Sequence, residues 1–215
     1  MEIQELKELW KSYDKKLEAS LRVNRKILEE LQTQKAQSSI RSSIRTQGLG
    51  IFIGIFYVLG LGFLVYYNLA NLYFSISIGM IMLFTILAIA AYLRHVVILG
   101  QINISESILE TQKKLSMVQS SDTAIGRLMI LQTPFWCTFF LSNTLLEHAG
   151  LSFWVIWGPI TGALTFGSIW LYRNLTRKNM HKKWVRTLLD SFGGKYIRKA
   201  SEFLNEIEEF NTEKT

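Results

Sequence analysis

The chain has 215 residues, of which 49% are hydrophobic and 13% aromatic, and its formal net charge is +7. Its apolar content is high for a soluble domain, and the ionic residues avoid two long stretches, so the composition excludes an ordinary soluble fold. Residues 48–93 contain no Asp, Glu, Lys or Arg, and residues 128–172 contain only Glu147. This distribution predicts an all-α membrane protein, a four-helix transmembrane bundle with long cytoplasmic amphipathic or coiled-coil helices.

Residues 1–47 are predicted to form a cytoplasmic amphipathic helix. No Gly or Pro occurs between Glu2 and Gln47, and good helix formers predominate. Apolar residues recur at alternating steps of three and four, a heptad pattern that needs a partner helix. Asn24 occupies a first heptad position, where a polar residue sets register or oligomeric state; a partly hydrated Asn beside a fraying seam is the alternative. The predicted interaction seam here is Ile3, Leu6, Trp10, Tyr13, Leu17, Asn24, Ile27 and Leu31.

Each uncharged stretch is too long for one helix across a hydrocarbon core of about 30 Å, and suits two crossings joined by a tight turn. Residues 48–93 are predicted to form transmembrane hairpin 1, with spans at 48–70 and 72–93. Residues 128–172 are predicted to form transmembrane hairpin 2, with spans at 128–147 and 151–172.

The cytoplasmic helical connection, residues 94–127, carries a second amphipathic stripe. No proline lies between Leu93 and Gln119, so the second span is predicted to continue into the cytoplasm as one helix. The sequence SSDTAIGR then predicts a turn and a helix N-cap before the third span.

Hairpin 2 contains residues that kink helices or bring them close together. Pro134 and Pro159 each remove a helical hydrogen bond, which indicates either a packing kink or a gating or substrate role. Gly158 and Gly162 have the spacing that lets membrane helices approach closely. Polar residues on the last two spans indicate either hydrogen bonds between helices or a small polar pathway; they include Gln132, Asn143, Thr161, Thr165 and Ser168.

Residues 173–215 are predicted to be a cytoplasmic basic segment followed by a C-terminal helix. Phe203, Ile207 and Phe210 belong to the apolar row of this helix, and its outer face is acidic. The expected contact joins ASLRVNRKILEEL, residues 19–31, to SEFLNEIEEF, residues 201–210. Exposed ion pairs there would set register more than stability.

The positions of Lys and Arg predict the topology. Ten lie in residues 1–47, four in 94–127 and ten in 173–215, so these segments share one side of the membrane. The positive-inside rule makes that side the cytoplasm and predicts a multi-pass protein of the inner (plasma) membrane with both termini cytoplasmic. The clustered cations suit an anionic lipid bilayer, and direct nucleic-acid binding is not expected.

The sequence offers no catalytic, cofactor or metal motif. Cys137 is the single cysteine and has the character of a small buried hydrophobe. Glu147 and His148 adjoin at the predicted outer surface, and two ligands do not make a metal site. We therefore expect a protein that is not an enzyme.

The sequence ELKELWKSYDKKLEASLRVNRKILEEL, followed by four predicted spans, resembles a loose family of uncharacterised four-span bacterial inner-membrane proteins often encoded beside extracytoplasmic-type sigma factors. The resemblance covers residues 4–31 and the topology. It implies a membrane-tethered regulator whose cytoplasmic helix contacts a sigma factor.

The expected function is that of a non-enzymatic multi-pass membrane protein that presents a cytoplasmic helical bundle for protein interaction, with a possible regulatory role. The expected partner is a second copy or another protein, bound through the cytoplasmic helices. The alternative is a subunit of a small transporter or channel with a pathway between spans 3 and 4.

Overall fold

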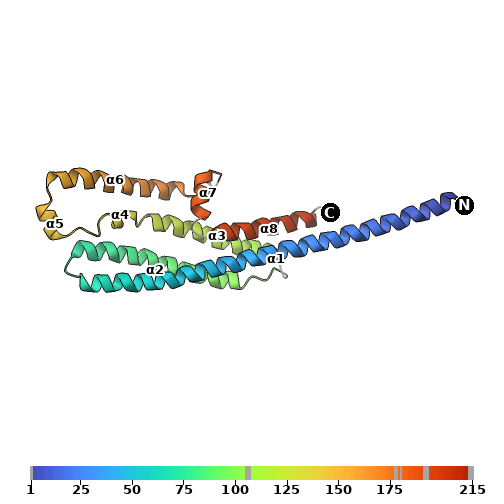
Figure 1. The fold of residues 1–215 in the computed structure, drawn as a ribbon, viewed down its shortest axis with the longest axis horizontal. Coiled ribbons are helices and arrows are strands. Elements are labelled where there is room, and N and C mark those ends of the chain that lie inside the picture. Colours follow the sequence, from blue (N-terminus) through green and yellow to red (C-terminus); the bar gives the residue numbers. More distant parts are fainter. Residues whose placement is uncertain (1, 105–107, 177–178, 180, 191–193, 213–215) are drawn as a thin grey trace.

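The computed structural model describes residues 2–104, 108–176, 179, 181–190 and 194–212, and the side chains of 2–5 and 210–212 lie outside this description. The fold is all-α, and no strand occurs among these residues. Figure 1 shows an elongated molecule dominated by one very long helix. The helices are α1 (Glu2–Tyr67), α2 (Leu72–Gly100), α3 (Ile108–Ile130), α4 (Thr133–Trp136), α5 (Asn143–His148), α6 (Leu151–Asn174), α7 (Lys183–Leu189) and α8 (Lys195–Thr212).

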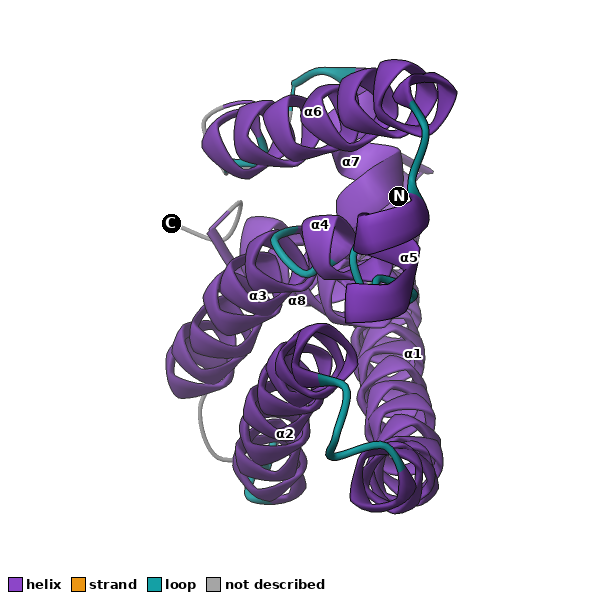
Figure 2. Cartoon of the chain, turned by 90° about the vertical axis from the view of Figure 1, so that its left-hand side faces the viewer, coloured by secondary structure: helices purple, strands orange, loops and turns teal. Residues whose placement is uncertain are grey.

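The chain runs along the long axis four times. The α1–α2 turn and α5 lie at one end, whereas both termini point toward the other (Figure 1). Viewed from the end that carries the turns, α1 and α2 lie side by side, α4 and α5 lie beside them, and α6 lies beyond (Figure 2). The pass made of α3, α4 and α5 therefore separates α6 from the α1–α2 hairpin.

The α1–α2 hairpin is closely packed. Asn71 caps α2, because its side-chain oxygen accepts a hydrogen bond from the Phe74 backbone N–H at 3.3 Å. A Cβ atom added at Gly54 would lie only 3.1 Å from Ile89, so this glycine permits a close approach of the two helices. Leu61, Ile78 and Ile81 form a buried cluster nearer the turn.

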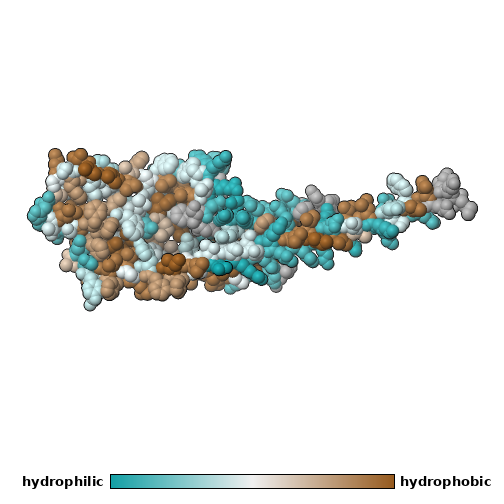
Figure 3. All heavy atoms as spheres, in the orientation of Figure 1, coloured by the Kyte–Doolittle hydropathy of each residue, from teal (hydrophilic) through white to brown (hydrophobic). Residues whose placement is uncertain are grey.

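Three helices of the described chain, α1, α2 and α6, are long and apolar enough to cross a membrane. Their apolar side chains cover the half of the molecule that holds the turns, and polar residues dominate where α7 and α8 lie (Figure 3). The uncharged part of α1, residues 48–67, is about 30 Å long at 1.5 Å per residue, which matches a hydrocarbon core.

The third pass differs from the single helix predicted for residues 128–147. In the structure α3 ends at Ile130, the four-residue α4 follows, and α5 begins only at Asn143. Side chains from other helices satisfy the backbone carbonyls freed by these breaks: Asn71 Nδ2 donates to Leu141 O at 3.0 Å, and Trp157 Nε1 donates to Cys137 O at 2.9 Å. These two bonds leave both carbonyls hydrogen-bonded although the helix is broken there.

The connection between the two hairpins also differs from its prediction. The helix expected to continue from Leu93 to Gln119 ends at Gly100, and α3 starts again at Ile108. Lys114 Nζ donates to Gln101 O at 3.2 Å across this turn. The segment SSDTAIGR, predicted to be a turn, lies inside α3 because it packs against other helices, with Asp122, Ile125 and Gly126 buried.

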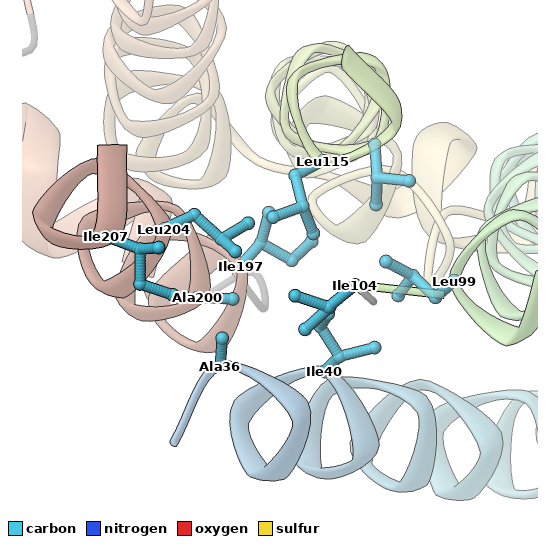
Figure 4. Close-up of a cluster of buried hydrophobic side chains, with 10 residues drawn as sticks. Ala36, Ile40, Leu99, Ile104, Leu115, Ile197, Ala200, Leu204 and Ile207 are labelled. Atoms are coloured by element: carbon cyan, nitrogen blue, oxygen red, sulfur yellow. The ribbon is translucent and has the colours of Figure 1, made fainter. Parts of the chain in front are cut away.

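The largest core cluster lies where α1, α2, α3 and α8 meet. Figure 4 shows side chains from these helices and from the α2–α3 turn converging, with Ala36 of α1 facing Ala200 of α8. This core joins the C-terminal helix to the middle of α1. Its buried members are Ala36, Ile40, Leu99, Ile104, Leu115, Val118, Ile197, Ala200, Leu204 and Ile207.

Candidate functional site

The N-terminal part of α1 projects beyond the rest of the molecule with its apolar stripe uncovered. Leu6 is 67% exposed, Trp10 69% and Leu17 59%. Tyr13, Ile27 and Leu31 are also exposed large side chains, and Asn24 on the same stripe is exposed. Figure 3 shows apolar side chains along this projecting helix. Ile3 belongs to the helix, but its side chain lies outside the described residues.

The C-terminal helix packs antiparallel on the next part of α1. Gln32 donates a hydrogen bond to Glu206, and the Lys35 ammonium lies 5.6 Å from the centre of the Phe203 ring. Ile207 is buried in the shared core and Phe203 packs against it, whereas the side chain of Phe210 lies outside the description. The contact expected between residues 19–31 and 201–210 is therefore displaced along α1, toward residues 32–44.

Arg198 fixes the start of α8 through ion pairs with two carboxylates. Arg198 Nη2 lies 2.8 Å from Asp190 Oδ2, and Arg198 Nη1 lies 2.7 Å from Glu202 Oε1. The hydrogen bonds that Arg198 donates to the Asp190 carboxylate are the main cause that raises the pKa of Arg198 above its ordinary value. The guanidinium therefore stays charged, and it holds the end of α7 against α8.

A buried pair of ionisable residues lies between α2 and α3. His95 Nδ1 is 3.1 Å from Asp122 Oδ1, and the two residues are only 1% and 3% exposed. The Tyr92 ring lies 5.9 Å from the His95 ring, centre to centre. The segment SSDTAIGR, which contains Asp122, was predicted to be a turn, and no sequence pattern connected it with His95. The sequence offered one signal that these residues are buried: each lies one helical turn from an apolar residue, His95 from Leu99 and Asp122 from Val118.

Two further buried polar side chains of α1 lie at the level of this pair. Ser43 and Gln47 are buried, and within the described part of the chain their side-chain polar atoms have no hydrogen-bond partner. Gly54 lies beside Ile89, and Ile40 shares a cluster with Leu99, so the antiparallel register brings residues 43–47 level with the end of α2 that carries His95. The bundle thus contains a polar layer, defined as Ser43, Gln47, His95 and Asp122.

The residues predicted to kink or pack hairpin 2 have distinct positions. Pro134 lies in the first turn of α4, where it interrupts the third pass, and Pro159 lies inside α6. A Cβ atom added at Gly158 or Gly162 would meet no atom within 4 Å. Within the described part of one chain, these two glycines therefore bring no other helix close.

A groove of about 510 Å³ separates α4 from α6. Trp136, Phe140 and Trp157 contribute aromatic walls, and Thr161 contributes a hydroxyl. Gln132, Asn143 and Thr165 are not part of its lining, and the hydroxyls of Thr165 and Ser168 donate to carbonyls of their own helix. The predicted polar faces of spans 3 and 4 are therefore not joined by this groove.

Among the described residues no three His, Cys, Asp or Glu side chains converge as metal ligands would. No protein-family model matches the chain, and no curated protein or solved structure matches it either.

Proposed function

We propose that this chain is a non-enzymatic multi-pass protein of the inner (plasma) membrane whose cytoplasmic helices bind protein, with a regulatory role. The observation that carries the proposal is the uncovered stripe from Leu6 to Leu31 on a helix that continues without a break into an apolar span. Exposed apolar surface of this extent on the water-exposed part of a protein marks an interaction site.

The orientation follows from charge. The projecting part of α1 and the segment around α7 and α8 hold most of the Lys and Arg residues and lie at the same end of the molecule. The positive-inside rule assigns that end to the cytoplasm. Acidic residues mix with the basic ones along residues 2–31, which favours protein over an anionic lipid surface as the cover of the stripe.

The proposed partner classes are a second copy and another cytoplasmic protein. The resemblance of residues 4–31 to sigma-factor-associated membrane proteins favours a regulator of transcription in the second class. In both classes the large side chains Trp10 and Tyr13 would anchor the contact, because aromatic residues in a desolvated interface carry much of the binding energy.

The test measures whether the stripe is covered in the native membrane. Two variants of the Cys137→Ser protein each carry one cysteine, Tyr13→Cys on the stripe and Lys15→Cys on the opposite face. A membrane-impermeant thiol reagent should label both from the cytoplasmic side only. The Tyr13→Cys thiol should react several-fold more slowly, because a partner shields it. Equal labelling rates of the two cysteines would contradict the proposal.

The second candidate function is a subunit of a small transporter or channel. The broken third pass favours it, because discontinuous membrane helices commonly line substrate sites. The buried His95–Asp122 pair also favours it, since this pair lies level with residues 43–47, at one end of the apolar spans, and buried ionisable groups often mark proton relays. Proton uptake into vesicles that is lost in Asp122→Asn and retained in Lys15→Cys would support this function over the first.

A further inference from the structure

The C-terminal helix is too short to cover the whole stripe. Gln32 pairs with Glu206 and Lys35 with Phe203, so the antiparallel register places Thr212, the end of α8, near residue 25 of α1. Among the described residues nothing in the same chain covers the stripe from Leu6 to Asn24. This bare part is about 28 Å long at 1.5 Å per residue, roughly five helical turns.

We propose that a second copy of this chain covers the bare stripe, with the two α1 helices packed parallel and in register as a coiled coil. This inference rests on the proposed function and names its partner. Because α1 enters the membrane as one unbroken helix, two copies with the same topology must point the same way. Both also start from the same depth in the bilayer, so each stripe residue meets its own counterpart.

Asn24 suits this arrangement. In a parallel, in-register pair the two Asn24 side chains face each other at a first heptad position, and each amide offers both a donor and an acceptor. A single Asn at such a position fixes register and favours a defined oligomeric state at some cost in stability. An antiparallel pair would place Asn24 opposite Leu6 and leave the amide against an apolar side chain.

Charge also favours a second copy over a strongly acidic or basic partner. Residues 2–31 hold seven acidic and seven basic side chains, so this segment has no net charge. A second copy packed on this segment therefore meets no excess of like charge, whereas a strongly charged partner would find no opposite excess to pair with.

The rest of the molecule leaves room for this pair. With 3.6 residues per turn, the stripe lies roughly a quarter to a third of a turn away from Ala36 and Leu61, which face α8 and α2. The same stripe continues into the apolar span through Leu49, Ile53 and Leu64, all of them exposed. Two α1 helices can therefore meet along their length, with the other helices of each copy outside the pair.

The test uses disulfide crosslinking of the full chain in native membranes. In a Cys137→Ser background, Ser20→Cys introduces a thiol at a fourth heptad position of the seam, and Arg22→Cys introduces one on the opposite face; both native residues are exposed. Mild oxidation should convert Ser20→Cys to a covalent dimer and leave Arg22→Cys monomeric. Adding Leu6→Asp and Leu17→Asp to Ser20→Cys should abolish the dimer and halve the mass of the detergent-solubilised particle.

Equal crosslinking at the two positions, or a particle of one-chain mass before the Asp substitutions, would overturn the second-copy proposal. The thiol-labelling test then separates the two ideas. A shielded Tyr13→Cys together with no Ser20→Cys dimer would mean that a different protein covers the stripe, and the proposed function would stand. A freely labelled Tyr13→Cys with no dimer would overturn both.

Discussion

Two neighbouring parts of α1, residues 6–24 and residues 25–47, have the same helical character but different environments. In the second part Ala36 is fully buried against α8, whereas in the first Leu17 is 59% exposed. The helix is continuous through both, because local propensity alone supports it. The difference teaches that the length of α8, which ends at Thr212, decides where one chain stops covering its own helix.

The largest expected effect compares a covered leucine with a bare one. Leu204→Ala removes a fully buried side chain from the core between α1 and α8 and should lower the free energy of unfolding by about 2–5 kcal/mol. Leu17→Ala should change the same quantity by no more than about 0.5 kcal/mol in the single chain. Circular dichroism during SDS titration of dilute protein measures both. Similar losses for the two variants would show that the stripe is covered within one chain.

Substitutions in the polar layer should cause the next largest change in unfolding free energy. Asp122→Leu leaves His95 buried without its partner and should cost about 3 kcal/mol of unfolding free energy. The double variant His95→Leu, Asp122→Leu should recover most of this loss, since two apolar side chains replace the pair. A double variant as unstable as Asp122→Leu would show that the pair stabilises the fold by more than offsetting the cost of burying its two members.

The third comparison is between two glycines of the apolar helices, Gly54, which packs against another helix, and Gly158, which does not. Gly54→Leu forces side-chain atoms against Ile89 and should cost roughly 1–2 kcal/mol of unfolding free energy. Gly158→Leu, where a Cβ atom meets nothing within 4 Å, is the matched control and should be neutral in the single chain. The same SDS titration measures both, and a large loss in Gly158→Leu would place this glycine in a contact between chains.

The smallest expected effect concerns the attachment of α8. Arg198→Met removes the contacts with Asp190 and Glu202 and should cost about 0.5–1 kcal/mol, because the groups are partly exposed and the pairs are screened by solvent. The measurement is the salt dependence of thermal unfolding, which the native protein should show and Arg198→Met should largely lose. Equal salt dependence in the native protein and in Arg198→Met would mean that the ionic contribution to stability comes from other residues.

Charge and hydropathy in the sequence predicted the all-α class and the apolar helices α1, α2 and α6, because burial in lipid depends on composition averaged over many residues. The breaks in the third pass, after Ile130 and before Asn143, were not predicted, because they are stabilised by Asn71 and Trp157, which lie outside this segment. Residues that satisfy a distant carbonyl leave no periodic pattern near the break.

The site shows the same division between local and distant information. The heptad steps from Leu6 to Leu31 located the stripe, since helix periodicity is local. The position of α8 on α1 was predicted too near the N-terminus, because several registers of two apolar rows satisfy the same pattern. His95 and Asp122 were missed because only the α2–α3 turn, after Gly100, brings them together.

The unbroken course of α1 makes it a rigid lever. From Gln47, near the membrane end of the bundle, to Leu6 the helix spans about 60 Å at 1.5 Å per residue. A tilt of about 5° at the membrane displaces the tip by about 5 Å, close to one helical turn. A small reorientation of the apolar helices is thereby amplified at the N-terminal tip, and a force on that tip acts on these helices with the same leverage.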